Sequence, residues 1–408
     1  MCKEIWARQS TACRFCGDDQ LRSFSLSANE ILTPYKKIKN GVITIENGII
    51  TEVREHRERG NEKISSDFSE SIIVPGFIDV HIHGIAGVDV MDATVGSMDK
   101  MRKSLVNHGV TAFCPTSDTA PLDHIKNALK TINASKKSNA RALGAHLEGP
   151  FLSPEKPGAM IAEDLRTPSI DEFDELWDTS KKSIKLITIA PEVPGAIELI
   201  KHASSLGVTV SLGHSNATYE ETLAGIRAGA SHATHLFNAM RAYHHREPGI
   251  LGAVLENPKV SVELIVDFVH VHPSITRLVC KLKPKDKVIL VTDAIRATDM
   301  PDGVFKNRHE LHVKNGEARL PDGTLAGSTL TLDKALRNLV FKLGIPLKDA
   351  VTMMTANPAK DIRVDDEIGS IEVGKRADLV ILDKNLNVMK TIVGGEIVFE
   401  NLKPKRSR

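Results

Sequence analysis

Two histidines and an aspartate alternate in the stretch FIDVHIH, which spans residues 77–83. Residues two apart on an extended strand point to the same side, so Asp79, His81 and His83 share one face and apolar residues occupy the other. Imidazole nitrogens and carboxylate oxygens are ligands that zinc and similar divalent ions accept. An isolated His-x-His pair is weak evidence of a site, so the rest of the sequence must supply further ligands.

Further side chains of the same kind follow apolar runs elsewhere in the chain. They are Glu148 after ALGAHL, His214 after VTVSLG, His235 within HATHLF, and Asp293 after KVILVT. A lone polar residue after a strand is often a helix cap, and we interpret His146 and His232 as structural residues of this kind. Several metal-competent side chains at the ends of different strands instead predict a hydrolytic metal site with an open position for water.

The elements that must position these residues alternate between apolar runs and segments with helical periodicity. The runs are 77–83, 110–114, 142–147, 184–190, 208–213, 232–237, 260–266 and 287–292, with helices expected over 98–109, 122–133, 219–230 and 332–344. Such alternation is typical of an α/β fold with a parallel sheet. Eight units in residues 76–355 predict a (β/α)₈ TIM barrel, whose catalytic side chains lie at the carboxyl ends of the strands. An open doubly wound sheet is disfavoured because no Gly-rich GxGxxG turn follows the first run.

Both ends of the predicted barrel are flanked by β-rich segments. Residues 21–75 contain two apolar runs around Asn47-Gly48, a strong hairpin signal, and residues 356–400 contain ADLVILD and EIVFE. We expect the two segments to form a small β-sandwich domain. Residues 1–20 are expected to be a flexible leader and residues 401–408 a basic tail.

The overall charge excludes some classes of partner. The 408 residues carry 53 basic and 52 acidic side chains, so no strong field exists to hold nucleic acid or a membrane surface. No apolar run approaches the length of a membrane span, and the leader lacks a secretory apolar segment. Five scattered cysteines predict no disulfide framework, and we interpret the CxxC at Cys13 and Cys16, near Cys2, as incidental. These features favour a soluble, cytoplasmic protein.

Several motifs together resemble one family. VPGFIDVHIHG, HLEGPF, GHSNAT and THLFNAM are similar to motifs of the amidohydrolase superfamily, and specifically of its N-acetylglucosamine-6-phosphate deacetylases. The resemblance extends from about residue 21 to 400. It implies a barrel with a small β-sandwich, a phosphorylated amino sugar as substrate, and hydrolysis of its N-acetyl group to release acetate.

The resemblance also implies roles for the candidate ligands. Glu148, His214 and His235 would hold a main divalent ion, and His81 and His83 would hold a second ion with Glu148 as a bridge. Zinc is the expected metal, with Fe²⁺, Co²⁺ or Mn²⁺ as alternatives, at one or two ions per subunit. In this family an aspartate at the position of Asp293 takes a proton from the nucleophilic water and returns it to the leaving amine.

Substrate contacts follow from the same resemblance. Arg246 and His270 match positions that contact the phosphate, and Asn238 and Ala239 match positions that contact the sugar phosphate. The arginine can come from the neighbouring subunit in this family, so we expect a homodimer or a higher homo-oligomer.

Two positions depart from the family pattern. Met160 stands where a carbonyl-polarising histidine is usual, and a thioether cannot donate that hydrogen bond. Phe268 stands where glycine is usual, before His270. Alternative interpretations are another metal-dependent amidohydrolase, acting on N-acetylgalactosamine 6-phosphate or a cyclic amide, and a catalytically impaired protein that binds an amino-sugar phosphate.

Overall fold

The computed structural model describes residues 23–55, 66–134, 139–306 and 308–401. The expected leader over 1–20, with its cysteines, and the expected tail after residue 401 lie outside these residues.

Eight parallel strands form a nearly closed barrel, which confirms the predicted fold class. They are β5 (Phe77–Ile82), β8 (Val110–Ser117), β10 (Ala145–Glu148), β11 (Ile184–Ile189), β12 (Thr209–Leu212), β13 (His232–Ala233), β14 (Ser261–Ile265) and β15 (Val288–Val291). Neighbours in the chain are neighbours in the sheet, and a parallel bridge between Ile82 and Ala294 brings the first and last strands together. The short β9 (Arg141–Ala142) pairs with β8 beside β10.

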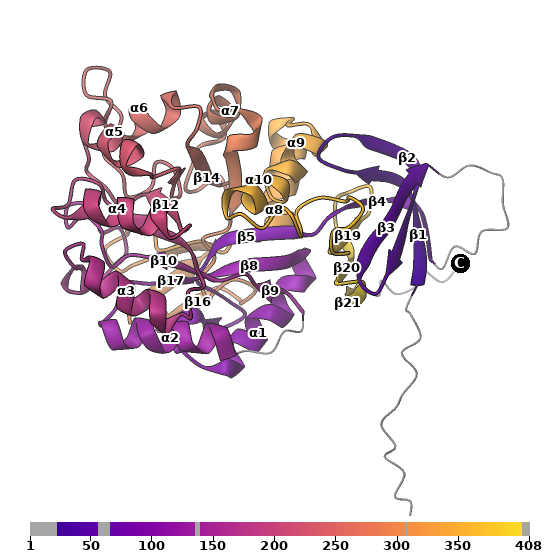
Figure 1. The fold of residues 1–408 in the computed structure, drawn as a ribbon, viewed down its shortest axis with the longest axis horizontal. Helices are drawn as coiled ribbons and strands as arrows, with labels where there is room; N and C mark the ends of the chain where they lie inside the picture. The colour runs from indigo at the N-terminus through magenta and orange to yellow at the C-terminus, as the bar shows by residue number, and fades with distance from the viewer. Residues whose placement is uncertain (1–22, 56–65, 135–138, 307, 402–408) are drawn as a thin grey trace, which may run out of the picture.

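Helices cover the outside of the barrel (Figure 1). They are α1 (Val95–Leu105), α2 (Leu122–Ala134), α3 (Ile170–Thr179), α4 (Ala196–Ser205), α5 (Tyr219–Ala228), α6 (Gly249–Glu256), α7 (Pro273–Leu282), α8 (Leu332–Arg337), α9 (Leu347–Thr352) and α10 (Ala356–Asp361). Local sequence fixes where they start: at α5, Thr218 and Glu221 form a capping box. The four expected helices are present as α1, α2, α5 and α8, although α8 itself continues as a π-helical turn over Asn338–Lys342.

Strands from both chain ends form a second, seven-stranded sheet. They are β1 (Ser23–Leu32), β2 (Lys37–Glu46), β3 (Ile49–Glu55), β4 (Ser66–Pro75), β19 (Leu379–Leu382), β20 (Val388–Val393) and β21 (Glu396–Glu400), in the order β21-β20-β19-β4-β1-β2-β3. Figure 1 shows the indigo and yellow segments side by side at one end of the barrel. Helix α10 contacts β5 and β15 instead, so its packing favours assigning it to the barrel rather than to a domain that begins at residue 356.

This second sheet curls back on itself. The expected hairpin turn at Asn47-Gly48 joins β2 to β3, and both residues have positive φ, as a type I′ turn requires. A Cβ added to Gly48 would lie 2.4 Å from the carbonyl oxygen of Gly394, although β3 and β20 stand near opposite ends of the strand order. The curled sheet encloses its own apolar core, which includes Ile43 and Ile381.

A three-stranded sheet that the sequence did not predict follows β15. It comprises β16 (Gly303–Lys306), β17 (Glu310–Lys314) and β18 (Glu317–Arg319), and it packs on a small core with Ile295 and Leu311. A two-stranded ribbon, β6 (Gly84–Ile85) and β7 (Val88–Asp89), follows β5. None of the helices in the described ranges has the length and apolar character needed to cross a membrane.

The close approach of Gly48, in the turn between β2 and β3, to Gly394 gives a test of the curled sheet. Gly48→Ala should lower the free energy of unfolding by more than the approximately 1–2 kcal/mol expected for a left-handed alanine alone, because the new methyl group meets backbone. Gly374→Ala is the matched control: its φ of 92° is also left-handed, but nothing lies within 4 Å of the added carbon. Equal losses in urea unfolding of the two variants would contradict the turn contact.

Candidate metal centre and substrate pocket

A single carboxylate lies at the centre of the candidate site. Glu148 ends β10 with only 2% of its surface exposed. Its Oε1 lies 2.9 Å from Nε2 of His235 and 3.2 Å from Nε2 of His214, and these two nitrogens are 3.0 Å apart. The Nδ1 of His214 lies 3.1 Å from the carbonyl oxygen of Lys156, so it is the protonated nitrogen and Nε2 is left to face Glu148.

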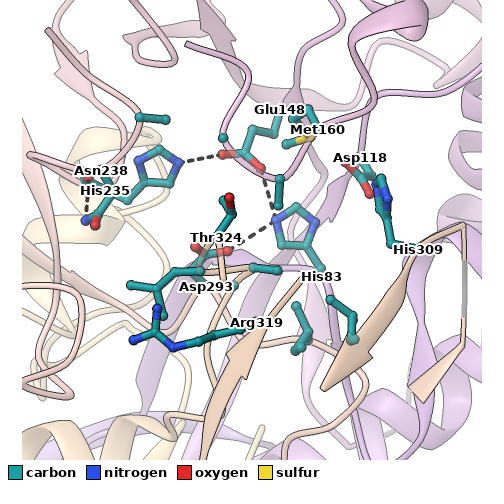
Figure 2. A pocket seen from close by; sticks show the side chains of 18 of the residues that line it. His83, Asp118, Glu148, Met160, His235, Asn238, Asp293, His309, Arg319 and Thr324 are labelled. Carbon is teal, nitrogen blue, oxygen red and sulfur yellow. Dashed lines mark hydrogen bonds and ion pairs between the residues drawn. The ribbon is translucent and has the colours of Figure 1, made fainter. Parts of the chain in front are cut away.

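A second group of side chains shares Glu148. Its Oε2 lies 3.0 Å from Nε2 of His83, and Nε2 of His81 lies 3.3 Å from the same His83 nitrogen. Asp293 places Oδ1 3.3 Å from His83 and 3.6 Å from His81. Figure 2 shows His83 between the carboxylates of Glu148 and Asp293, and His235 on the other side of Glu148. The structure therefore brings together all the predicted ligands and Asp293.

The donor set fits a divalent ion. The sets Glu148, His214, His235 and His81, His83, Asp293 each offer ligand atoms that lie within 4.8 Å of one another, and all six residues are buried. Ligands of a tetrahedral zinc at about 2.0–2.1 Å would lie roughly 3.3 Å apart, close to the spacings in the first set. Imidazole and carboxylate ligands with room for a water molecule are the composition of a hydrolytic site.

Burial and charge act in opposite directions on these groups. Burial alone would lower the pKa of His83, but hydrogen bonds to Asp293 and Glu148 and their negative charges raise it to about 10. Burial would raise the pKa of Asp293, yet the charges of His81 and His83 hold it below its usual value. The cluster thus stabilises positive charge among its imidazoles, as a cation site must.

Three of the clustered residues lie on left-handed backbone just after their strands. The φ angles are 45° at His214, 25° at His235 and 50° at Asp293. Such angles are uncommon for residues other than glycine and are found at functional sites where the surroundings hold them. At Asp293 the backbone N–H donates to the carbonyl oxygen of His81 at 2.9 Å, and the carbonyl accepts from the N–H of Ser328 at 2.7 Å. Both contacts fix the turn that directs the Asp293 carboxylate inward.

Asp79 supports the centre from below. Its Oδ2 accepts from the Thr292 hydroxyl at 2.6 Å, and its Oδ1 accepts from the backbone N–H groups of Thr292 and His81, both at 3.3 Å. Burial raises the pKa of Asp79 to about 7, although these hydrogen bonds oppose the shift. The side chain therefore ties β5 to β15 beneath Asp293.

Three further buried residues, His146, His232 and Glu263, support the cluster. Sequence reasoning missed Glu263. His146 lies against the hydroxyls of Thr116 and Thr188, in keeping with a structural role. Glu263, in the middle of β14, lies 3.0 Å from Nε2 of His232 and 2.9 Å from Nδ1 of His81. An acidic residue inside the apolar run VSVELIV was the available signal, because buried carboxylates need partners.

A pocket of about 420 Å³ opens beside the cluster. Asn238, Ala239 and His270 line it, together with His83, Glu148 and Asp293. Figure 2 shows Asn238 on the His235 side of the cluster. His270 is held by Asp267, whose Oδ2 lies 2.7 Å from the imidazole Nδ1. Burial would lower the pKa of His270, but the hydrogen bond and charge of Asp267 raise it. The pocket therefore has a proton-donating imidazole close to the candidate metal centre.

Arg246 is the predicted site residue that this pocket does not include. It lies on an exposed loop and lines a second cavity with Arg241 and Tyr219. Within one chain Arg246 therefore does not line the pocket that opens beside the cluster.

Arginines and one further histidine line the pocket instead, and sequence reasoning missed them because the sheet formed by β16, β17 and β18 was not predicted. Burial and the charge of Arg308 lower the pKa of this histidine, His309, so among these residues only the arginines are cationic at neutral pH. Arg308 donates to the carbonyl oxygen of Thr119 at 2.6 Å and pairs with Asp164, which anchors the β16–β17 connection over the pocket. His309 and Arg319 reach the pocket from the same sheet (Figure 2).

Of the two departures from the family pattern, Met160 lines the pocket and Phe268 does not. Met160 lines the pocket close to Glu148 (Figure 2). Asp118, directly after β8, lines the same part, and burial raises its pKa to about 6. Phe268 has a φ of 69°, the left-handed region that glycine occupies most easily, which explains why glycine suits this position.

The sequence matches one protein family over most of its length. A model described as "Amidohydrolase family" matches residues 72–398, and the chain belongs to that family. Within it, the chain is 38% identical over 379 residues to the N-acetylglucosamine-6-phosphate deacetylase of Bacillus subtilis (strain 168), covering 90% of this chain and 95% of that protein. It is 37% identical over 379 residues to the N-acetylgalactosamine-6-phosphate deacetylase of Escherichia coli O157:H7, covering 91% and 98%.

A solved structure is similar over nearly the whole fold. It is a mutant N-acetyl-D-glucosamine-6-phosphate deacetylase of Mycobacterium smegmatis in complex with N-acetyl-D-glucosamine-6-phosphate. The TM-score is 0.88 at 33% identity, covering 92% of this chain and 99% of that one. The metal dependence of the amidohydrolase family agrees with the buried donor groups found here.

Removing a ligand of the first set should remove metal. Glu148→Gln, His214→Asn and His235→Asn should each lower the bound divalent ion per chain, since each deletes a ligand atom from the same position. His202→Asn is the control, because His202 lies in α4 and pairs with Asp174, outside the cluster. Metal analysis after gel filtration checks the expectation, and full occupancy in all three ligand variants would contradict it.

Proposed function

We propose that this chain hydrolyses the N-acetyl amide of N-acetylglucosamine 6-phosphate, giving glucosamine 6-phosphate and acetate. The observation that carries the proposal is the buried cluster around Glu148, which opens onto a pocket large enough for a small sugar phosphate. The relatives named as deacetylases of amino-sugar 6-phosphates support this substrate class. We also propose that the protein acts in the cytoplasm, because the sequence favours that location and it fits this metabolic activity.

We propose that Glu148, His214 and His235 hold the main ion and that His81 and His83, with Glu148 as a bridge, hold a second. Zinc fits the nitrogen-rich donor set best, and Fe²⁺, Co²⁺ or Mn²⁺ are the alternatives. When bound, such an ion lowers the pKa of water toward about 7 and polarises the amide carbonyl.

The chain's own residues then manage the protons. Asp293 is the proposed general base, because its carboxylate lies at the pocket surface and its pKa is held below the usual value, so it is ionised at neutral pH. It would take the proton of the attacking water at Oδ1 and deliver it to the nitrogen as the carbon–nitrogen bond breaks. The β16–β18 sheet and Met160 would limit access of other water to the reacting amide.

Substrate binding is proposed to use His270 and Asn238 with the backbone of Ala239. A phosphate dianion needs cationic donors, and His270 is one such group on the pocket. Arg246 would complete the phosphate site only from a second subunit, because it lies outside the pocket of its own chain. We therefore propose a homodimer or higher oligomer in which this loop reaches the neighbouring pocket.

The phosphate requirement gives the first test of this function. Purified protein should release acetate from N-acetylglucosamine 6-phosphate far faster than from the unphosphorylated sugar, because binding energy at the phosphate positions the amide. Arg246→Ala should raise KM for the phosphorylated sugar and leave the slow reaction of the free sugar unchanged. Equal rates for the two wild-type substrates would contradict the proposal, and an unchanged KM would exclude Arg246 from the site.

One relative favours a second substrate. The match to an N-acetylgalactosamine-6-phosphate deacetylase is as extensive as the match to the glucosamine enzymes, so the axial 4-hydroxyl isomer is a specific alternative. Competition between the two sugar phosphates in one reaction distinguishes them through the ratio of their kcat/KM values. A cyclic amide such as dihydroorotate serves as the negative control.

Substitution of Asp293 tests whether the chain hydrolyses the amino-sugar phosphate or only binds it. Asp293→Asn keeps the shape of the side chain but cannot accept a proton, so kcat should fall by at least about 100-fold while the substrate still binds. Steady-state rates and a binding isotherm for each protein check this expectation. A protein that only binds the amino-sugar phosphate would show wild-type turnover near background and no change in the variant.

A further inference from the structure

Glu263 is fully buried in β14, outside the proposed ligand set, and yet contacts both halves of the candidate metal centre. Its Oε2 lies 2.9 Å from Nδ1 of His81 and also accepts the backbone N–H of His235 at 2.8 Å. Its Oε1 lies 3.0 Å from Nε2 of His232. One carboxylate therefore bridges a ligand of the proposed second ion and a ligand of the proposed main ion.

The contact with His81 decides which ring nitrogen faces the centre. A carboxylate next to Nδ1 places the proton on that nitrogen, so Nε2 carries the lone pair. That Nε2 is the atom that lies 3.4 Å from Glu148 and 3.6 Å from Asp293. Without an acceptor at Nδ1, nothing in this contact set would favour the ring orientation and tautomer that a metal ligand needs.

The contact with His235 is of a different kind. Within the described part of the chain, Nδ1 of His235 is buried without a hydrogen-bond partner, so its ring is not oriented as the His214 ring is. The backbone N–H bond to Glu263 holds this residue in its left-handed turn instead. His232, which also lies 2.6 Å from Asp361, supports Glu263 from the opposite side.

We propose that Glu263 is a positioning residue that presets His81 and His235 for metal binding and joins the two ion positions into one unit. This inference rests on the proposed metal centre but not on the substrate. Loss of the hydrogen-bond acceptor should therefore weaken metal binding even in the absence of any sugar.

Two substitutions separate hydrogen bonding from packing. Glu263→Leu keeps a similar volume without an acceptor. Glu263→Gln keeps the two contacts that the proposal needs, because its amide oxygen can accept from His81 and from the His235 backbone N–H. Burial alone would lower the pKa of His232, but Asp361 and Glu263 raise it to about 10, so the amide nitrogen would face an Nε2–H and only that third contact is lost. Asp378→Leu is the control for loss of a buried carboxylate elsewhere, since Asp378 pairs with Arg141 and accepts from the Gly394 N–H at 2.7 Å, far from the ligands in sequence and in fold.

The experiment is titration of the metal-stripped full chain with Zn²⁺ against a chromophoric chelator, with metal content measured after gel filtration. Glu263→Leu should bind Zn²⁺ about 10- to 100-fold more weakly than wild type, while Glu263→Gln and the folded Asp378→Leu control should stay within a few fold. Wild-type affinity and stoichiometry in Glu263→Leu would overturn the proposal, and so would equal losses in the Leu and Gln variants.

A folding failure of Glu263→Leu would not leave the proposal untested. Glu263→Asp retains a buried carboxylate but withdraws it by one methylene group, so weaker Zn²⁺ binding is expected in a folded protein and unchanged binding would overturn the inference. Because the readout is metal affinity, the result is independent of acetate release. A protein that fails to deacetylate any sugar but shows these metal effects would contradict the proposed function alone.

Discussion

A buried carboxylate with four imidazole neighbours is the constraint on which the rest of this structure depends. Glu148 Oε1 meets nitrogens of His81, His214 and His235, and Oε2 meets His83. Removing a carboxylate from water is costly unless charge and hydrogen bonds compensate, so the barrel must deliver those rings accurately. The parallel strands do so because they all end at the same face, where short turns direct the side chains inward.

The interior beneath Glu148 is polar rather than filled only by branched aliphatic side chains. His146 lies 2.9 Å from the hydroxyl of Thr188, which in turn lies 2.8 Å from that of Thr234. Ser211 contacts the same Thr234 hydroxyl. Every hydroxyl can donate or accept, so this layer satisfies buried polar atoms whichever way the imidazoles above are protonated. The proposed metal ligands therefore lie next to a layer of hydrogen-bonded polar side chains. The carboxylates of Asp79 and Glu263 add further hydrogen bonds to the ligands and their strands.

The sequence made the barrel and its principal cluster predictable, since strand period and helix period alternate clearly and the polar residues follow the strands. It was less informative about geometry that depends on partners distant in the chain. Glu263 looked like one more residue of a strand until its contacts with His81 and His232 were known. The β16–β18 sheet has short strands, and although ELHVK in β17 alternates polar with apolar residues, β16 and β18 are too short to show a pattern, so neither the sheet nor the pocket residue His309 was predicted. The distance of Arg246 from its own pocket is set by a loop, which motifs do not describe.

The left-handed turns at His214, His235 and Asp293 also restrict how this site can decay over evolutionary time. Glycine, asparagine and aspartate tolerate such backbone, whereas branched side chains are strained there. A lineage that abandoned metal chemistry while keeping the barrel would be expected to drift toward these short residues at the three positions. Former metal centres in this fold would then be recognisable by what replaces the ligands, a pattern of Asn, Asp and Gly two residues beyond the strands.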